Sequence, residues 1–200
     1  MQRSSMNPTS KSYVSIQLPL GGHSFSRANL EKIDSTKGSS VVATLPTAKC
    51  VAVPAEVFNK EEAHSYLQAS GITVANDECV VYSDTSESVV AVMAINAECH
   101  KLLSSKFGDS LSYTTPLLNS PTPEQGTVLH LSQGVLYIRV ANEGLRLAEV
   151  VEVATDGDIL YYLENIHRVF NIYNMYARAE GETQRLMTIC KKLFTKIVCE

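Results

Sequence analysis

The chain has 200 residues, of which 44% are hydrophobic, and a formal net charge of -4 at pH 7. This length and composition suit a buried core in either one large domain or two small ones. The acidic balance gives no general attraction to phosphate backbones or anionic membranes, so neither nucleic acid nor a membrane is expected as a partner.

Cysteine usage and the N-terminus both indicate a soluble protein of a reducing compartment. The five cysteines include no C-x-x-C pair: Cys50, Cys79, Cys99, Cys190 and Cys199. Such scattered cysteines are typical of free thiols rather than of disulfides or a zinc site. The start MQRSSMNPTS lacks the apolar segment of a signal peptide, and no run approaches the roughly 20 apolar residues of a membrane span. We therefore expect a cytoplasmic protein with a disordered N-terminus over residues 1–11.

The first predicted element is a β-hairpin. Apolar and polar residues alternate over residues 13–18, and Gly21 and Gly22 then offer the positive φ angles of a tight turn before a second strand at residues 23–27. The elements expected next are a loop at 30–40, strands at 41–45 and 50–53, a helix capped by Asn59 and Glu62 that ends at Gly71, a hairpin of 79–82 and 88–95, a helix from Asn96 to Gly108, and a strand at 111–114.

A domain boundary is predicted at residues 119–126, NSPTPEQG, because two prolines and a glycine in eight residues cannot continue a helix or a central strand. The elements predicted after it are strands at 128–132, 135–141 and 145–153 with a turn at Gln133-Gly134, a helix from Gly157 to about Phe170 capped by Asp156, a strand at 172–179, a turn at Gly181, a helix from Glu182 to Phe194 and a strand at 196–198. Residues 172–179 also suit a continuation of the preceding helix, but we favour the strand.

The order of three antiparallel strands followed by helix, strand, helix and strand resembles the ribonuclease-H-like unit, which when duplicated makes the actin-like ATPase fold. Segment 129–142 echoes segment 16–29, with strand, glycine turn, strand and then Arg-x-Ala-Asn or Arg-Ala-Asn. More narrowly, the chain resembles an uncharacterised bacterial protein family with that fold. The features that carry this resemblance are segments 14–25, 53–58, 89–103, 128–140 and 158–162.

The resemblance implies an α+β or α/β protein with two ribonuclease-H-like lobes, each of which opens with a β-hairpin. The lobes are expected at residues 12–119 and 127–200, joined by a linker at 120–126. The first half has more elements than the simple unit, so a single α+β domain remains an alternative.

In ATPases of this fold the hairpin turns surround nucleotide phosphates, and an acidic residue near each turn helps to hold Mg²⁺. Here both turns keep their glycines, Gly21 and Gly22 in the first and Gly134 in the second, but neither contains a carboxylate. A glycine in a hairpin turn is also required by geometry alone. We therefore expect no catalysis, no metal site and no cofactor, with weak ATP binding at these three glycines as the exception to test.

Other candidate groups have simple structural explanations. His64 has no second His or Cys at helical spacing, and Cys99 and His100 point to different faces of a helix. Asp156 and Asp158 are explained by helix capping. For the tyrosines at 161, 162, 173 and 176, half-buried packing is favoured over an interaction surface.

These observations favour a non-catalytic actin-like module that acts in protein interaction or assembly, with a protein partner of unknown identity. The alternative is a nucleotide-binding switch that uses the cleft between the lobes, with Asp84, Asp156 or Asp158 replacing the missing acids. A nuclease would need several carboxylates on one strand face, and the predicted strands offer too few.

Overall fold

The computed structural model describes residues 13–33, 40–85 and 88–199 of a mixed α/β chain. Its strands are β1 (Tyr13–Gln17), β2 (Ser40–Thr44), β3 (Cys50–Pro54), β4 (Glu78–Tyr82), β5 (Val89–Asn96), β6 (Leu111–Thr114), β7 (Gln125–Ser132), β8 (Val135–Asn142), β9 (Leu145–Glu152), β10 (Tyr176–Gly181) and β11 (Lys196–Cys199). Its α-helices are α1 (Arg27–Glu31), α2 (Ala63–Ala69), α3 (Ala97–Phe107), α4 (Asp156–Phe170) and α5 (Thr183–Cys190). Short 3-10 turns are η1 (Leu20–Gly22), η2 (Ala55–Val57), η3 (Lys60–Glu62), η4 (Gly108–Ser110), η5 (Pro116–Leu118) and η6 (Ile172–Asn174).

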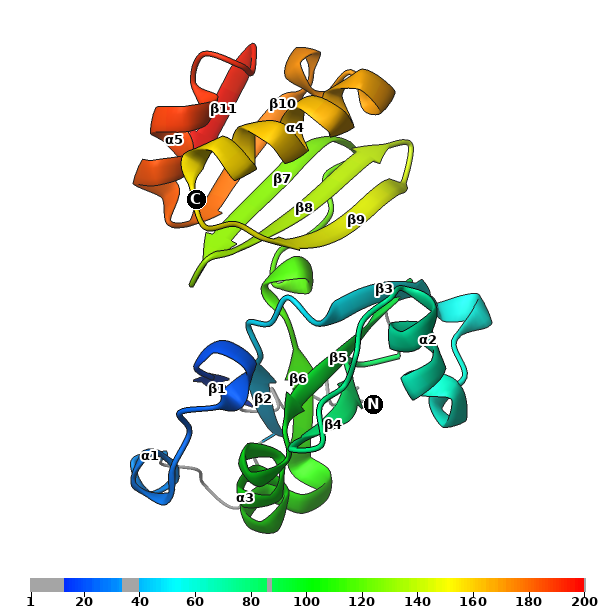
Figure 1. Ribbon diagram of the computed structural model, residues 1–200, viewed down its shortest axis with the longest axis vertical. Coiled ribbons are helices and arrows are strands. Elements are labelled where there is room, and N and C mark those ends of the chain that lie inside the picture. Colours follow the sequence, from blue (N-terminus) through cyan, green and yellow to red (C-terminus); the bar gives the residue numbers. More distant parts are fainter. Residues whose placement is uncertain (1–12, 34–39, 86–87, 200) are drawn as a thin grey trace, which may run out of the picture.

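Two small sheets form the first half of the chain (Figure 1). Strands β1, β2 and β6 are parallel in that order, whereas β3, β5 and β4 are antiparallel in that order. A parallel bridge between Ser83 and Tyr113 joins the β4 edge to the β6 edge. Across this bridge the strands follow the order β3-β5-β4-β6-β2-β1, so three antiparallel strands are followed by parallel ones.

The second half is one five-stranded sheet with the order β9-β8-β7-β10-β11. Strands β7, β8 and β9 are antiparallel, while β10 is parallel to β7 and β11 is parallel to β10. Helices α4 and α5 cover the face of this sheet that is turned away from the first half (Figure 1). This confirms the element order predicted for residues 128–198, including the strand rather than a helix after α4.

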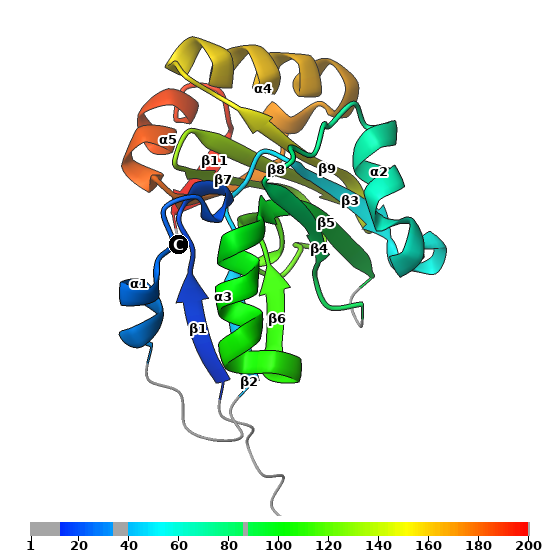
Figure 2. The same cartoon turned by 60° about the horizontal axis from the view of Figure 1, so that its bottom comes forward.

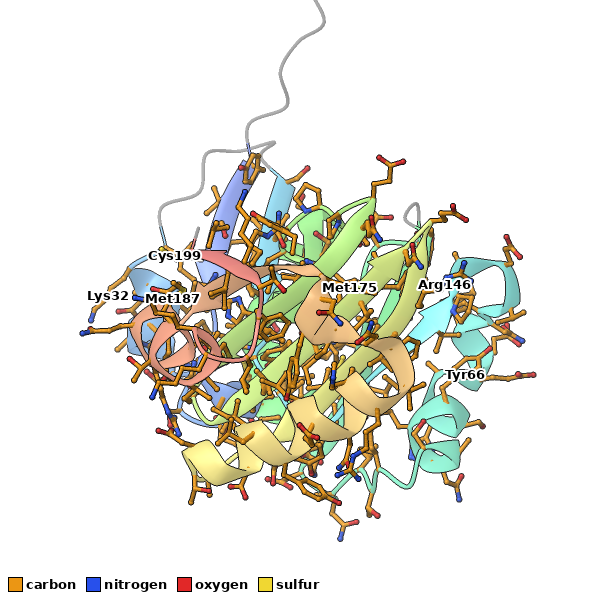
Figure 3. All side chains as sticks on the ribbon, turned by 90° about the horizontal axis from the view of Figure 1, so that it is seen from above. Lys32, Tyr66, Arg146, Met175, Met187 and Cys199 are labelled. Atoms are coloured by element: carbon orange, nitrogen blue, oxygen red, sulfur yellow. The ribbon has the colours of Figure 1, made fainter. Side chains whose placement is uncertain are left out.

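Side chains along β8 point alternately to the two faces of its sheet, so this strand contributes to the hydrophobic cores of both halves. Leu136 and Ile138 join the core beneath α4 and α5, whereas Val135 and Tyr137 join the core of the first half. Burial on both faces accounts for the nearly continuous apolar sequence of this strand. Figure 3, viewed from above, shows Met175 and Met187 on the α4 and α5 side of the sheet, and Tyr66 marks α2 of the first half.

The hairpin predicted for residues 13–27 is wrong. After β1 the chain forms η1, with positive φ angles of 59° at Gly21 and 78° at Gly22, and then enters α1. The partner of β1 is instead β2, which runs parallel to it. A capping box at the start of α1 explains the helix, because the Ser26 amide donates to Oδ1 of Asn29 at 3.0 Å.

Several predicted boundaries also shift. The cap of α4 is Thr155 rather than Asp156, and α5 ends at Cys190 rather than at Phe194. Asn59 Oδ1 accepts from the amide of Glu61 in η3, ahead of a short α2. In contrast, Asn96 caps α3 as predicted.

The predicted linker overlaps the first strand of the second half. Strand β7 begins at Gln125, so the last two residues of the predicted linker, 120–126, belong to the five-stranded sheet. The N-terminal segment 1–11 and most of the predicted loop at 30–40 lie outside the described residues. Among the helices of the described part, none is both long and apolar enough to cross a membrane.

Candidate functional site

The two glycine turns predicted from the sequence lie side by side between the halves. The amide of Leu20, at the start of η1, donates to Oε1 of Gln133 in the β7–β8 turn at 3.0 Å. Figure 2 shows the segment after β1 reaching the end of the five-stranded sheet. Sequence reasoning therefore selected two segments that are neighbours in space, although only the second is a hairpin turn.

The amides of the first turn already have acceptors within the chain. The Gly21 amide donates to the Pro46 carbonyl at 2.8 Å, and the Gly22 amide donates to the Pro19 carbonyl at 2.8 Å. A phosphate at this place would have to displace these bonds.

Packing supplies a structural reason for Gly22. A Cβ atom there would lie 3.0 Å from Sγ of Cys99 and 3.1 Å from Cγ1 of Ile95. Gly134, with a φ of 75°, has an open environment, because its nearest neighbour would be the Val153 carbonyl oxygen at 3.5 Å. The first turn is thus shaped by the core beneath it, and the second by its backbone conformation.

A cluster of charged side chains lies on the face of the five-stranded sheet that is turned toward the first half. Arg139 of β8 is 3% exposed and donates to the Ser120 carbonyl at 2.7 Å, to Ser120 Oγ at 2.6 Å and to Thr122 Oγ1 at 3.1 Å. Arg178 of β10 also donates to Ser120 Oγ, at 2.7 Å, and to the Pro121 carbonyl at 2.8 Å. Two guanidinium groups therefore hold the linker against the sheet.

Glu180 of β10 provides the negative charge of this cluster. It is 8% exposed and pairs with Nε of Arg178 at 2.9 Å, while its other oxygen lies 3.4 Å from Nδ1 of His130. Burial alone would raise the pKa of Glu180, but hydrogen bonds with His130 and Ser120 and the charges of Arg178 and Arg139 outweigh it and lower the pKa to about 2. The cluster is therefore ionised at neutral pH.

A groove of about 730 Å³ opens beside this cluster, between the halves. We call it the polar groove and define it by Ser15, Gln17, Thr44, Ser112, Thr114 and Arg139. Its other side is formed by residues 118–122, which include the start of the linker, and by Ser83, Asp84 and Ser88.

The three acidic residues considered from the sequence, Asp84, Asp156 and Asp158, have different environments in the structure. Asp84 lines the polar groove. Asp158 caps α4, where it accepts from the amides of Ala154 at 2.9 Å and Thr155 at 2.8 Å, and these bonds lower its pKa. Asp156 pairs with Nε of Arg185 at 2.7 Å. Capping and pairing thus account for both acids at the start of α4.

The remaining sequence candidates do not assemble into a reactive site. Cys99 is fully buried, and burial raises the pKa of its thiol to about 12, whereas His100 lies 2.9 Å from the hydroxyl of Tyr113. His64 is exposed on α2. Within residues 13–33, 40–85 and 88–199, no three His, Cys, Asp or Glu side chains gather closely enough to hold a metal ion.

Comparison with protein families matches residues 30–176 to the family described as "Protein of unknown function (DUF3822)". The chain belongs to this family. The matched residues extend from the end of α1 to the start of β10, so they include the linker and parts of both halves but not Ser15 and Gln17 of the polar groove. No curated protein matches the chain.

Solved structures identify the fold of this family member. A Bacteroides thetaiotaomicron protein with an actin-like ATPase fold and unknown function is 15% identical, with a TM-score of 0.74 over 95% of this chain and 91% of that chain. The chain therefore has the actin-like ATPase fold. The cytoplasmic domain of EpsL, an inner-membrane component of the Vibrio cholerae type II secretion system, matches at 13% identity with a TM-score of 0.38 over 82% of this chain and 66% of that chain. That score is too low to support an argument.

Sequence reasoning missed the charged cluster. Its signal is a charge inside an apolar strand, as with Arg139 in VLYIRVAN and with Arg178 and Glu180 in YARAEG. Buried charges of this kind require partners. The partners, however, come from the linker and from strands far apart in the sequence, so the chain order alone did not reveal them.

Proposed function

We propose that this DUF3822 member is a non-catalytic actin-like module that acts in the cytoplasm through contact with another protein. The observation that carries the proposal is the direct contact between the two turns, from the Leu20 amide to the Gln133 side chain. In the ATPases that the fold resembles, these positions face nucleotide phosphates. Here they hold one half of the chain against the other.

The proposal includes a duplicated architecture in which both halves derive from one ribonuclease-H-like unit. The supporting observation is the strand order, because β3-β5-β4-β6-β2 and β9-β8-β7-β10-β11 have the same sequence of antiparallel and parallel neighbours. The connections differ, since β3 and β2 precede β4 in the first half whereas their counterparts follow β7. The domain limits proposed are residues 12–119 and 127–200, with the correction that β7 starts at Gln125.

Helix α4 offers a surface for a protein partner. Tyr161 is 64% exposed and Val169 is 74% exposed, and Leu160 is partly exposed beside Tyr161. Tyr173, in contrast, stacks on His167 with ring centroids 4.0 Å apart and packs against Phe194. The tyrosines thus divide between packing and exposure, and Tyr161 supplies the large contact area at low entropic cost that interfaces favour.

Photo-crosslinking in cells tests the interaction. Tyr161 is replaced by the photoreactive amino acid p-benzoylphenylalanine, and a matched variant carries it at the exposed Gln184 of α5. We expect a discrete protein adduct from position 161 and none from position 184. The same adducts from both positions, or none from position 161, would contradict the use of this surface.

The polar groove supports a second candidate function, the nucleotide-binding switch, because Asp84 lines the groove. A carboxylate there is suited to hold a hard cation beside a phosphate. This alternative requires micromolar ATP binding that depends on Mg²⁺ and that Asp84→Asn weakens. Asp156 and Asp158 are not candidates for this role, because Asp156 pairs with Arg185 and Asp158 caps α4.

A further inference from the structure

The face of the β1-β2-β6 sheet that lines the groove carries mostly polar side chains, together with Tyr13 and Val42. The opposite face carries Ile16, Val41 and Ala43 in the core. On the groove side, the paired positions are Ser15, Val42 and Ser112 in one row and Gln17, Thr44 and Thr114 in the next. Thr44 is only 3% exposed. Ser15 and Gln17 are exposed, and Ser112 and Thr114 are partly exposed, so their side chains can hydrogen-bond to a bound molecule.

Arg139 places a cation in the same groove. Its contacts with Ser120 and Thr122 account for three of the five N–H donors of a guanidinium group. Ser120 Oγ receives donors from both Arg139 and Arg178, at 2.6 Å and 2.7 Å. Two arginines that converge on one oxygen form the arrangement that also binds an anionic oxygen.

The charges at the groove decide where an anionic group can lie. Arg139, which lines the groove, belongs to a cluster with two positive charges, on Arg139 and Arg178, and one negative charge, on Glu180. Asp84 adds a carboxylate on the other side, so an anionic group is favoured at the Arg139 end of the groove and disfavoured at the Asp84 end. The volume of about 730 Å³ lies within the range of roughly 300–1,000 Å³ found for small-molecule sites.

We propose that the polar groove binds a small, hydroxyl-rich molecule with one anionic group, of the sugar phosphate or sugar acid class. The anionic group lies at Arg139 and Ser120. The hydroxyl groups bond to the row formed by Gln17, Thr44 and Thr114. This inference concerns a ligand site separate from the glycine turns and does not depend on the protein-interaction role.

Calorimetric titration of the full chain with four probes tests the proposal. The probes are glucose 6-phosphate, glucuronate, glucose and inorganic phosphate. We expect saturable binding of glucose 6-phosphate or glucuronate, at least tenfold tighter than binding of glucose or phosphate, because only the combined ligand uses both parts of the groove. The better of the first two identifies the anionic group. Absence of saturable binding of both compounds up to about 10 mM, or equal affinity for all four probes, overturns the proposal.

Variants locate the site. Thr44→Val keeps the size and the strand preference of the side chain but removes a groove hydroxyl, and Thr73→Val makes the same change at an exposed residue outside the groove. We expect a loss of at least fivefold in affinity for Thr44→Val and no change for Thr73→Val. Arg139→Lys, checked for folding by thermal unfolding, should weaken the anionic probes and leave glucose unaffected. Wild-type affinity in both Thr44→Val and Arg139→Lys would place the ligand elsewhere and refute the assignment.

Discussion

At the scale of single residues, the charged cluster makes the contribution of Glu180 to stability depend on pH. Its folded-state pKa of about 2 lies below the ordinary value of 4.5. A lowered carboxyl pKa stabilises the fold fully above the unfolded pKa, and this contribution is lost as the pH falls from about 4.5 toward 2. The ion pair with Arg178 is therefore weakened as the pH falls through this range.

Glu180→Gln tests this assignment. We expect the free energy of unfolding to fall by about 2–3 kcal/mol at pH 6, because the variant leaves the buried Arg139 and the half-buried Arg178 without their counter-charge. The difference between variant and wild type should narrow by about 1 kcal/mol at pH 3.5. Urea unfolding of the variant and the wild type at both pH values measures this difference in the free energy of unfolding. Glu164→Gln is the control, since its exposed pair with Arg168 is worth under about 1 kcal/mol; a pH-independent loss for Glu180→Gln would refute the account.

The sequence could identify residues that act locally, but not those whose partners are distant. Asn96 caps α3 through the amide of Cys99, three residues away, and the pattern predicted it. Arg139 and Arg178 meet at Ser120, which precedes them by 19 and 58 residues. No local pattern brings such residues together, so this part of the candidate site could be recognised only in three dimensions.

At the scale of elements, the dipeptide Gly21-Gly22 is compatible with two different local structures, a hairpin turn and a 3-10 turn. Gly21 and Gly22 permit positive φ angles, and both a hairpin turn and η1 use them. Which of the two forms depends on the partner of β1, and the parallel pairing with β2 decides it. In the second half the β7–β8 turn joins strands that pair directly, so the hairpin prediction there was correct.

Gly22→Ala separates packing from backbone conformation. Its φ of 78° resembles the 74° of Gly71, but a Cβ at Gly22 would crowd Cys99 and Ile95, whereas a Cβ at Gly71 would meet no atom within 4 Å. We expect Gly71→Ala to cost about 1 kcal/mol and Gly22→Ala at least about 1 kcal/mol more. Chemical denaturation of both variants measures the difference. Equal costs would mean that packing does not determine this turn.

At the scale of the whole molecule, the two halves are joined by bonds as well as by a shared core. The Tyr137 hydroxyl of β8 accepts from the Thr47 amide at 2.8 Å, and its ring lies in the core of the first half. Hydrophobic periodicity predicted the order of elements in the second half, and the resemblance of that order to the ribonuclease-H-like unit implied the fold class. The contact between halves did not, because it depends on side chains that face each other across the groove and the linker.

Tyr137→Phe tests the bond between the halves. The ring keeps its packing, but the buried Thr47 amide loses its acceptor, so we expect a loss of about 1–2 kcal/mol in the free energy of unfolding. Hydrogen exchange at the Thr47 amide should accelerate as well. Tyr161→Phe, at an exposed site on α4, serves as the control with a change below about 0.5 kcal/mol. Unchanged exchange at Thr47 in Tyr137→Phe would contradict the role of this hydroxyl.

The measurement that tests the central proposal most directly is calorimetric titration of the full chain with ATP, with and without Mg²⁺. A module whose glycine turns bond to each other should show no binding tighter than about 1 mM, with the same result when Mg²⁺ is added. Micromolar binding that requires Mg²⁺ and that Asp84→Asn weakens would contradict the non-catalytic module and establish the nucleotide switch in its place.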